Sequence, residues 1–225
     1  YVAGVAAGLK LQQLIDEGKI KAEEAVIGYV GAFSLAEVIS GMTSYYLGAR
    51  SVCPSVTMKV QFVGSWSDPT LEAEAAKALI DKGAVMISQH SDNTTPATTA
   101  QERGVFHTGY NNDMTGVAPK ASLLSCRIDW TNYFYTFIAN YINGVENPSD
   151  YCGEMAKGEV VVTELNEAIA APGTKEKLAE VEAKIASGEI QVFDTSTFTV
   201  GGAELKNAFA LDTNGDFTPD SEEAV

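Results

Sequence analysis

Aromatic and hydrogen-bonding side chains come together at four places in this sequence, each directly after a short apolar run. Flat rings supply stacking area for a planar ligand, and carboxylates and amides supply the hydrogen bonds that fix its orientation. This combination predicts a site that binds a small molecule. The residues concerned are Phe33, Trp66, Asp68, His90, Asp92, Asn93, Tyr110, Asn111 and Asp113.

Each of these residues alone also has a simpler structural explanation. Asp68 stands before Pro69 and can cap a helix, and Asn112-Asp113 can shape a turn. His107 lies inside an apolar run, where a histidine is more often a satisfied sheet residue than a base. The whole set is harder to explain in this way, because turns do not need three aromatic rings.

The motifs of common catalytic sites are missing from the sequence. There is no nucleophile elbow, phosphate-binding loop, dinucleotide fingerprint or zinc-protease motif, and the chain has 2 histidines. We therefore expect a binding protein rather than an enzyme, with no catalytic residues and no cofactor.

The charge balance narrows the choice of partner. Thirty acidic residues against 15 basic ones give a formal charge of -15, which repels nucleic acid and anionic membranes. A neutral base, nucleoside or sugar stays compatible with such a surface. No apolar run is long enough to cross a bilayer. The three cysteines are expected as buried free thiols, with a Cys126–Cys152 disulfide as the alternative in an exported protein.

Strand-type and helix-type segments alternate along the first half of the chain. After an N-terminal helix over 1–18, with small residues such as Gly4 for close packing, strands are expected at 25–30, 57–63, 84–88 and 105–109. Helices are expected between them at 34–48, 68–83 and 95–104, the first opened by a Ser34–Glu37 capping box. Apolar strands joined by helices indicate an α/β fold with a parallel sheet covered on both faces. Ligands bind beyond the carboxyl ends of such strands, where the residues above would gather.

Beyond Gly116 the pattern is less regular, and a lobe boundary is placed there. One more strand is expected at 122–126, a helix at 134–144, a helix capped by Thr174 and a last strand at 189–193. Near the C-terminus, oxygen-bearing side chains follow the spacing of a calcium loop, although Phe217 stands where the sharp turn wants glycine. A solvated acidic turn is the favoured interpretation, and a weak, structural calcium site is the alternative. Its ligands would be Asp212, Asn214, Asp216, Asp220 and Glu223.

Several motifs in order resemble the BMP family, the basic membrane lipoprotein group of substrate-binding proteins for ABC transporters. The matching stretches are GARSV with Pro54 (48–54), SWSDP (65–69), AAKALIDKGA (75–84), HSD (90–92), GYNNDM (109–114) and Asp129-Trp130 with Tyr133. The resemblance runs from residue 1 to about 193. It adds Trp130 to the candidate ligand residues.

The resemblance implies a type I periplasmic-binding-protein-like fold, in which two Rossmann-like lobes joined by a hinge close on a purine base or nucleoside. Residues 1–115 would form the complete second lobe, and 116–225 the C-terminal part of the first lobe plus an acidic tail. Family members begin about a hundred residues earlier, judged from the ~100–150 residues of a usual domain. That segment would supply the rest of the first lobe and a lipid anchor. The implied protein is an extracytoplasmic lipoprotein or periplasmic receptor that delivers its ligand to an ABC transporter permease.

Two other functions remain open at this point. An intracellular α/β enzyme acting on nucleosides would use Asp92 or Asp113 as a base. A receptor of the same fold that binds a pentose would stack its aromatic rings on the sugar. The sequence does not choose among adenine, adenosine, guanosine and inosine.

Overall fold

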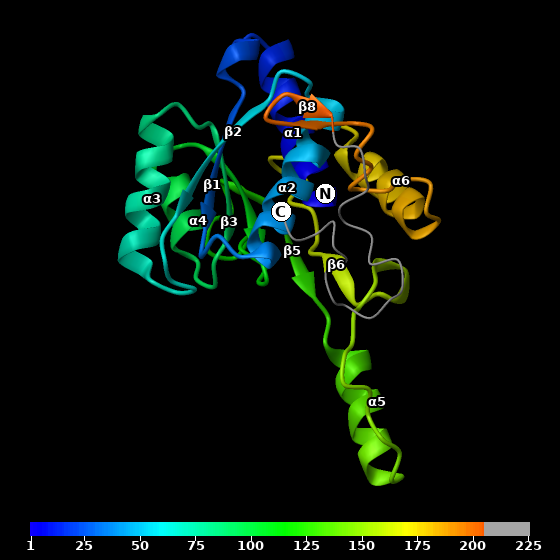
Figure 1. Ribbon diagram of the computed structural model, residues 1–225. Coiled ribbons are helices and arrows are strands. Elements are labelled where there is room, and N and C mark those ends of the chain that lie inside the picture. Colours follow the sequence, from blue (N-terminus) through cyan, green and yellow to red (C-terminus); the bar gives the residue numbers. More distant parts are fainter. Residues whose placement is uncertain (205–225) are drawn as a thin grey trace.

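The computed structural model describes residues 1–204 and is built on one six-stranded sheet (Figure 1). The strand order is β2-β1-β3-β4-β5-β6, with β1 to β5 parallel and β6 antiparallel to β5. The strands are β1 (Val26–Gly31), β2 (Thr57–Phe62), β3 (Met86–His90), β4 (Phe106–Tyr110), β5 (Ser122–Ile128) and β6 (Val160–Val162). The predicted α/β class with a mainly parallel sheet is confirmed.

Helices cover both faces of the sheet. One face carries α1 (Val2–Asp16), α2 (Ala36–Val52) and α6 (Thr174–Ala186), and the other carries α3 (Pro69–Asp81) and α4 (Thr95–Glu102) (Figure 1). Every residue of β1 and β3 is buried between these layers, whereas the edge strand β2 is exposed or half-exposed throughout. This explains why β1 is an uninterrupted run of apolar residues and glycine, with no alternating polar face.

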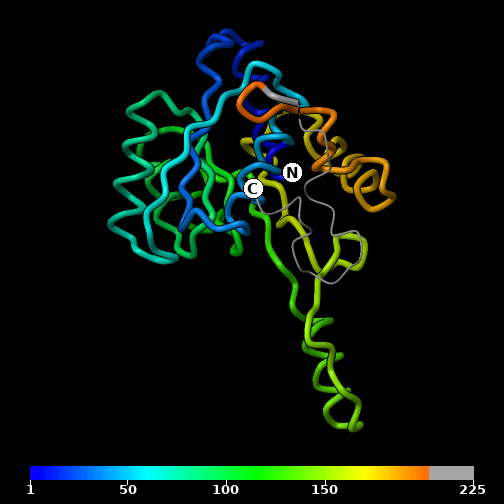
Figure 2. Tube along the Cα trace, in the orientation of Figure 1, coloured from blue at the N-terminus to red at the C-terminus, as the bar shows by residue number. Residues whose placement is uncertain are grey.

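The remaining elements lie outside the three layers. The helix α5 (Thr131–Ile142) projects away from the sheet, as the course of the chain in Figure 2 also shows. Two short 3-10 helices are η1 (Ala22–Glu24) and η2 (Met155–Lys157), and β7 (Thr199–Val200) pairs with β8 (Ala203–Glu204). Residues 129–151, which comprise α5 with its flanking segments, are called the arm below, and the rest of the described chain is called the lobe.

Helices α1 and α2 touch at two glycines, as the small residues of the N-terminal helix predicted. A Cβ added at Gly4 would lie 1.9 Å from the carbonyl oxygen of Tyr45, and one at Gly48 would lie 2.0 Å from that of Tyr1. No side chain fits at either position unless the helix backbones move apart. Gly48 therefore serves the packing of two helices and does not end α2, which continues to Val52.

The predicted Ser34–Glu37 capping box is wrong. Helix α2 begins at Ala36 with Leu35 as its N-cap residue, and no side chain caps it. Because the helix starts later than the spacing suggested, Ser34 lies outside the first turn. Glu37 faces His90 instead, with 3.7 Å between Oε1 and the ring Nε2.

The second half of the chain departs from the prediction in three places. Residues 189–193 form no strand, because the edge of the sheet beside β5 is already taken by β6, and the Ile190 N–H donates back to the Lys184 carbonyl at the end of α6. Thr174 is the first residue of α6 rather than its cap, and its hydroxyl donates to the Ala171 carbonyl. The sheet also continues across Gly116 into β5 and β6, so the described chain has no structural break there.

Other expectations concern the cysteines and the C-terminus. All three cysteines are free thiols, but only Cys53 is buried; Cys126 is partly buried, and Cys152, which directly follows the arm, is exposed. The calcium-like segment 212–223 lies outside the described residues. Within residues 1–204, no helix is long and apolar enough to span a membrane.

Candidate ligand site at the carboxyl edge of the sheet

Strands β1 to β5 all end at the same edge of the sheet, called the carboxyl edge below. The loop after β1 leads to α2 on one face, and the loop after the adjacent strand β3 leads to α4 on the other. Such a reversal opens a crevice between two neighbouring strands, and ligands of open α/β sheets bind there. His90, the last residue of β3, pairs with Gly31, the last residue of β1, so it stands at this point.

Four ring side chains form a continuous row along the carboxyl edge. The ring centroids of Phe33 and Trp66 are 5.8 Å apart, those of Trp66 and His90 6.1 Å, and those of His90 and Tyr110 4.0 Å. These residues, called the aromatic row below, come from β3, from β4 and from the loops after β1 and β2. The structure thus brings together rings that the sequence spreads over 78 positions, from 33 to 110.

His90 is the most unusual member of the row. Its side chain is 6% exposed, and its two ring nitrogens are the buried side-chain polar atoms without a hydrogen-bond partner in the described chain. The Nδ1 atom faces Gly41 of α2, where an added Cβ would come within 2.8 Å of it. Burial holds the pKa of His90 below its usual 6.5, although the Glu37 carboxylate partly offsets this effect. The ring is therefore neutral at pH 7.

The other end of the row is a protonated phenol beside exposed polar groups. Burial raises the pKa of Tyr110 to about 12, and the Glu37 charge adds to the effect. The Asp92 side chain is exposed, while its N–H donates to the Trp66 carbonyl at 2.7 Å and ties two loops together. Asn111 is also exposed and has a φ of 66°, a left-handed backbone that asparagine tolerates. Both side chains are free to meet a ligand.

Glu72, a buried residue that was not among the predicted site residues, connects these loops through hydrogen bonds. Glu72 of α3 accepts hydrogen bonds from the Ser91 hydroxyl (2.6 Å), the Asn93 amide and the Asp68 N–H (3.0 Å). Burial raises the pKa of its carboxyl group, and the hydrogen bonds oppose that shift. Its only signal in the sequence is its place in the first turn of a helix, which predicts a capping role and not a link to the loop after β3.

Three of the predicted ligand residues already use their side chains in hydrogen bonds within the protein. Asp68 caps α3 by accepting from the N–H groups of Thr70 and Leu71, both at 3.0 Å. Asn93 donates to Glu72 and accepts from the Thr95 N–H, and Asp113 accepts from Thr115. For Asp68 and Asp113 the simpler explanation accounts for every side-chain hydrogen bond that the described structure shows, whereas Asn93 also joins its loop to α3 through Glu72.

Trp130 lies apart from the aromatic row. It stands at the base of the arm, where its ring packs against Tyr133 (5.6 Å between centroids) and Phe134 (6.1 Å). The described structure gives it no contact with Phe33, Trp66, His90 or Tyr110.

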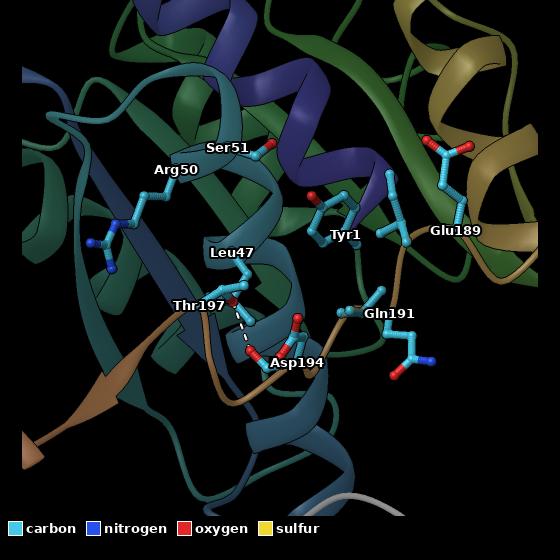
Figure 3. Close-up of a pocket in the computed structure, with 10 residues that line it drawn as sticks. Tyr1, Leu47, Arg50, Ser51, Glu189, Gln191, Asp194 and Thr197 are labelled. Carbon is cyan, nitrogen blue, oxygen red and sulfur yellow. Dashed lines mark hydrogen bonds between the residues drawn. The ribbon is translucent and has the colours of Figure 1, made fainter. Parts of the chain in front are cut away.

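A cavity of about 410 Å³ lies elsewhere, between α2 and the segment 189–197 (Figure 3). Tyr1, Arg50 and Asp194 are among its lining residues, and Arg50 points away from its centre in the view shown. It shares no residue with the aromatic row. The described residues also contain no cluster of three or more histidine, cysteine or acidic side chains that could hold a metal ion.

A three-layer α/β lobe with aromatic and polar side chains at the switch point of its sheet defines a ligand-binding domain of the type I periplasmic-binding-protein class. A solute-binding protein of an ABC transporter from Aeropyrum pernix K1 has the same fold, with a TM-score of 0.68 at 16% identity. That match covers 84% of this chain and 62% of the other. The model of the Bmp family, described as ABC transporter substrate-binding protein PnrA-like, matches residues 1–196. The chain belongs to this family.

Two curated relatives are named after different ligands, a purine and glucose. A purine-binding protein of Brucella abortus (strain 2308) is 36% identical over 187 residues, which cover 83% of this chain and 53% of the relative. A putative ABC transporter glucose-binding protein of Haloferax volcanii is 32% identical over 198 residues, which cover 88% of this chain and 48% of the relative. The chain thus spans about half the length of these relatives. The family is one of substrate-binding proteins and not of enzymes.

Proposed function

We propose that this protein is the substrate-binding receptor of an ABC importer and that it captures a purine base or nucleoside at the carboxyl edge of its sheet. The observation that carries the proposal is the aromatic row, which offers stacking surface beside free carboxylate and amide groups. The purine-binding relative at 36% identity supports the choice of ligand. The nucleoside-acting enzyme considered from the sequence is not carried further, because the family consists of binding proteins.

In this proposal the planar ligand stacks on Trp66 or Phe33, the two rings at the open end of the row. Both side chains are partly exposed, whereas His90 is covered. Asp92 and Asn111 serve as polar anchors, because their side chains are exposed at the same edge. Asp68, Asn93 and Asp113 shape the loops around the ligand, since their hydrogen bonds are already made within the protein.

The lobe then supplies one wall of the site, and the arm belongs to an opposing lobe. This assignment rests on the apolar surface of α5, none of whose residues is buried, and on the share of the relatives' length that the chain spans. Ligand binding would close the two lobes about a hinge, because a ligand that touches both stabilises the closed state. Trp130, at the base of the arm, lies where the two lobes would meet.

The receptor would work outside the cytoplasm and hand its ligand to a membrane permease, held at the cell surface by a lipid anchor or free in a periplasm. The formal charge of -15 fits this proposal, because it disfavours nucleic acid and anionic lipid as competing partners.

A sugar is the second candidate ligand. The relative named as a glucose-binding protein supports it, and the flat face of a sugar ring also packs on aromatic side chains. A purine presents a fully planar aromatic ring system, whereas a sugar presents a puckered ring that carries hydroxyl groups. The two therefore differ in how strongly they depend on Trp66.

Identification of the bound ligand tests the function directly. The full-length protein would be denatured and the released small molecule identified by mass spectrometry. Calorimetry would then compare adenine, adenosine, guanosine and inosine with glucose and ribose. We expect a purine in the released fraction and purine affinities at least tenfold above sugar affinities. A released sugar, with no heat from any purine, would overturn the proposal.

Two matched aromatic substitutions test the place of binding. Base–aromatic stacking is worth roughly 1–3 kcal/mol in nucleic-acid sites, so Trp66→Leu should weaken purine binding about tenfold or more. Phe106→Leu is the control, because Phe106 begins β4 at the opposite edge of the sheet. Unchanged affinity in Trp66→Leu, or an equal loss in both variants, would remove the aromatic row from the site.

A further inference from the structure

The two histidines of this chain are both buried, but only one has hydrogen-bond partners. His107 lies 3.2 Å from the Ser122 hydroxyl through Nδ1 and 3.1 Å from the Gln89 Oε1 through Nε2. His90 has neither, although its ring is covered. An unpaired buried polar atom destabilises the protein, so a ligand group that pairs with His90 would remove that cost on binding.

The geometry around His90 shows which nitrogen a ligand can reach. Nδ1 points to the backbone of α2 at Gly41, which leaves no room for a further group. Nε2 points to Glu37, and 3.7 Å between Nε2 and Oε1 is too long for a hydrogen bond. The Glu37 side chain is 63% exposed, so this gap lies at the border of the solvent.

We propose that His90 and Glu37 together recognise a hydrogen-bond donor on the ligand, such as an exocyclic amino group that donates to both Nε2 and the Glu37 carboxylate. The inference rests on the proposed function and names the polar contact that would give it specificity. A carboxylate only accepts, and a neutral imidazole with its proton on Nδ1 accepts through Nε2. An amino group carries two N–H donors and satisfies both, whereas a carbonyl group would face two acceptors.

The charges around the ring agree with a site for donors. Glu37 faces it from α2, and Asp92 acts on it from the loop that follows β3. Tyr110 packs against it from β4 as a neutral phenol, and Trp66 from the loop after β2 carries no charge. The groups that face the ring are thus negative or neutral, and a donor is favoured over an acceptor.

The same contact makes binding depend on pH in one direction. The ligand binds the neutral ring, and burial keeps the pKa of His90 below 6.5, so affinity is constant near pH 7–8. Once the pH falls below the pKa of the free site, His90 becomes a donor that pairs with Glu37 and opposes the ligand amino group. The affinity should then fall by up to about tenfold per pH unit, the limit for one competing proton.

The test uses calorimetry on the full-length protein with three related bases: adenine, 2-aminopurine and unsubstituted purine, which lacks the amino group. Adenine and 2-aminopurine carry the amino group at different positions, and one of them should place it between His90 and Glu37. We expect the wild type to bind that base about tenfold or more tightly than purine, because one buried hydrogen-bond donor contributes about this much. His90→Phe keeps a buried ring without polar atoms and should abolish this preference. Glu37→Gln should reduce it, because an amide presents a donor as well as an acceptor. Glu23→Gln, exposed on η1 at the far edge of the sheet, is the matched control.

A conservative variant keeps the test decisive if His90→Phe does not fold. His90→Gln retains an acceptor without a titrating group, so it should keep part of the preference for amino-bearing bases, and its affinity should no longer fall when the pH drops below the pKa of His90. Equal affinity of the wild type for purine and both amino-bearing bases overturns the inference, and so does an unchanged preference in the His90 variants. If Trp66→Leu still weakens binding in either case, the proposed function stands. A wild type that binds none of the three bases overturns the inference, and one that also binds no adenosine, guanosine or inosine overturns both.

Discussion

The lobe and the arm are both rich in apolar residues, but they use them differently. In β3 all residues are buried, and in β5, two strands away in the sheet, Leu123 and Leu124 have no exposed surface. In α5 no residue is buried, and Tyr141 and Ile142 are 80% and 75% exposed. The arm is held along its length by a few contacts of its own, such as the packing of Tyr133 on Tyr151 and the hydrogen bond from Asn140 to Asn147.

The difference shows that apolar content does not decide burial by itself. The strands of the lobe are covered because helices on both faces come from the same stretch of chain. Helix α5 carries a broad face of exposed apolar side chains, which includes Phe134, Ile138 and Tyr141. A large exposed apolar surface marks a place where something else packs. The lobe is therefore a unit that closes on itself, and the arm is not.

The largest effect should follow from a cavity in the lobe. Leu123→Ala removes a side chain with no exposed surface between α1 and the sheet, and such truncations cost about 2–5 kcal/mol. Urea unfolding followed by circular dichroism would measure the loss on the 225-residue chain. A cost below about 1 kcal/mol would mean that the core of the lobe is much looser than close packing implies.

An intermediate effect concerns the buried histidine of the lobe. Burial lowers the pKa of His107 to about 3 in the folded protein, against 6.5 when it is unfolded. Between these values the unfolded chain binds a proton that the folded chain does not, so stability is full above pH 6.5 and falls as the pH drops. At pH 5 the loss from this group is about 2 kcal/mol.

The variant His107→Gln isolates this contribution. It lowers stability at every pH by removing hydrogen bonds, but the further loss between pH 7.5 and 5 should be about 2 kcal/mol smaller than in the wild type. Denaturant unfolding at both pH values measures the two slopes. Parallel pH profiles for wild type and variant would show that His107 is protonated in the folded lobe at little cost.

The smallest effect is expected in the arm. Phe134→Ala removes a ring that is half-exposed, so the 225-residue chain should lose no more than about 0.5 kcal/mol, as at ordinary surface positions. The same substitution in the full-length protein should cost about 3–5 kcal/mol if an opposing lobe buries that ring. Equally small losses of stability in the 225-residue chain and the full-length protein would contradict the contrast between lobe and arm, because the arm would then be an ordinary surface element in both proteins.

The strands of the lobe were predictable because their signal is local. Apolar runs bounded by glycine and by polar turns located β1 to β5 to within about two residues, as boundary signals usually do. The predicted capping box at Ser34 was wrong because it rested on the spacing of four residues alone. That spacing does not determine where a helix begins, and α2 begins at Ala36. The strand predicted at 189–193 failed because a strand needs a free edge, and β6 already occupies it.

The candidate site was predictable as a set of loops but not as a set of contacts. The rule that ligands meet the carboxyl ends of parallel strands grouped Phe33, Trp66, His90 and Tyr110. Their order in the row, and the unpaired state of His90, depend on how close α2 comes to β3 at Gly41. Glu37 and Glu72 were given capping roles or none, because their partners lie in loops far away along the chain.

By itself, then, the sequence determined the class of the fold, the family and the edge of the sheet at which polar and aromatic residues gather, since all three follow from local patterns and ordered motifs. The tertiary structure alone decided which side chains are left free. Asp68, Asn93 and Asp113 look equivalent to Asp92 and Asn111 in the sequence, but their hydrogen-bonding groups are already used within the protein: Asp68 and Asp113 bond to their own turns, and Asn93 bonds to its own loop and to Glu72 of α3. A hydrogen bond forms over about 3 Å between particular atoms, and only the packing of helices on the sheet sets distances on that scale.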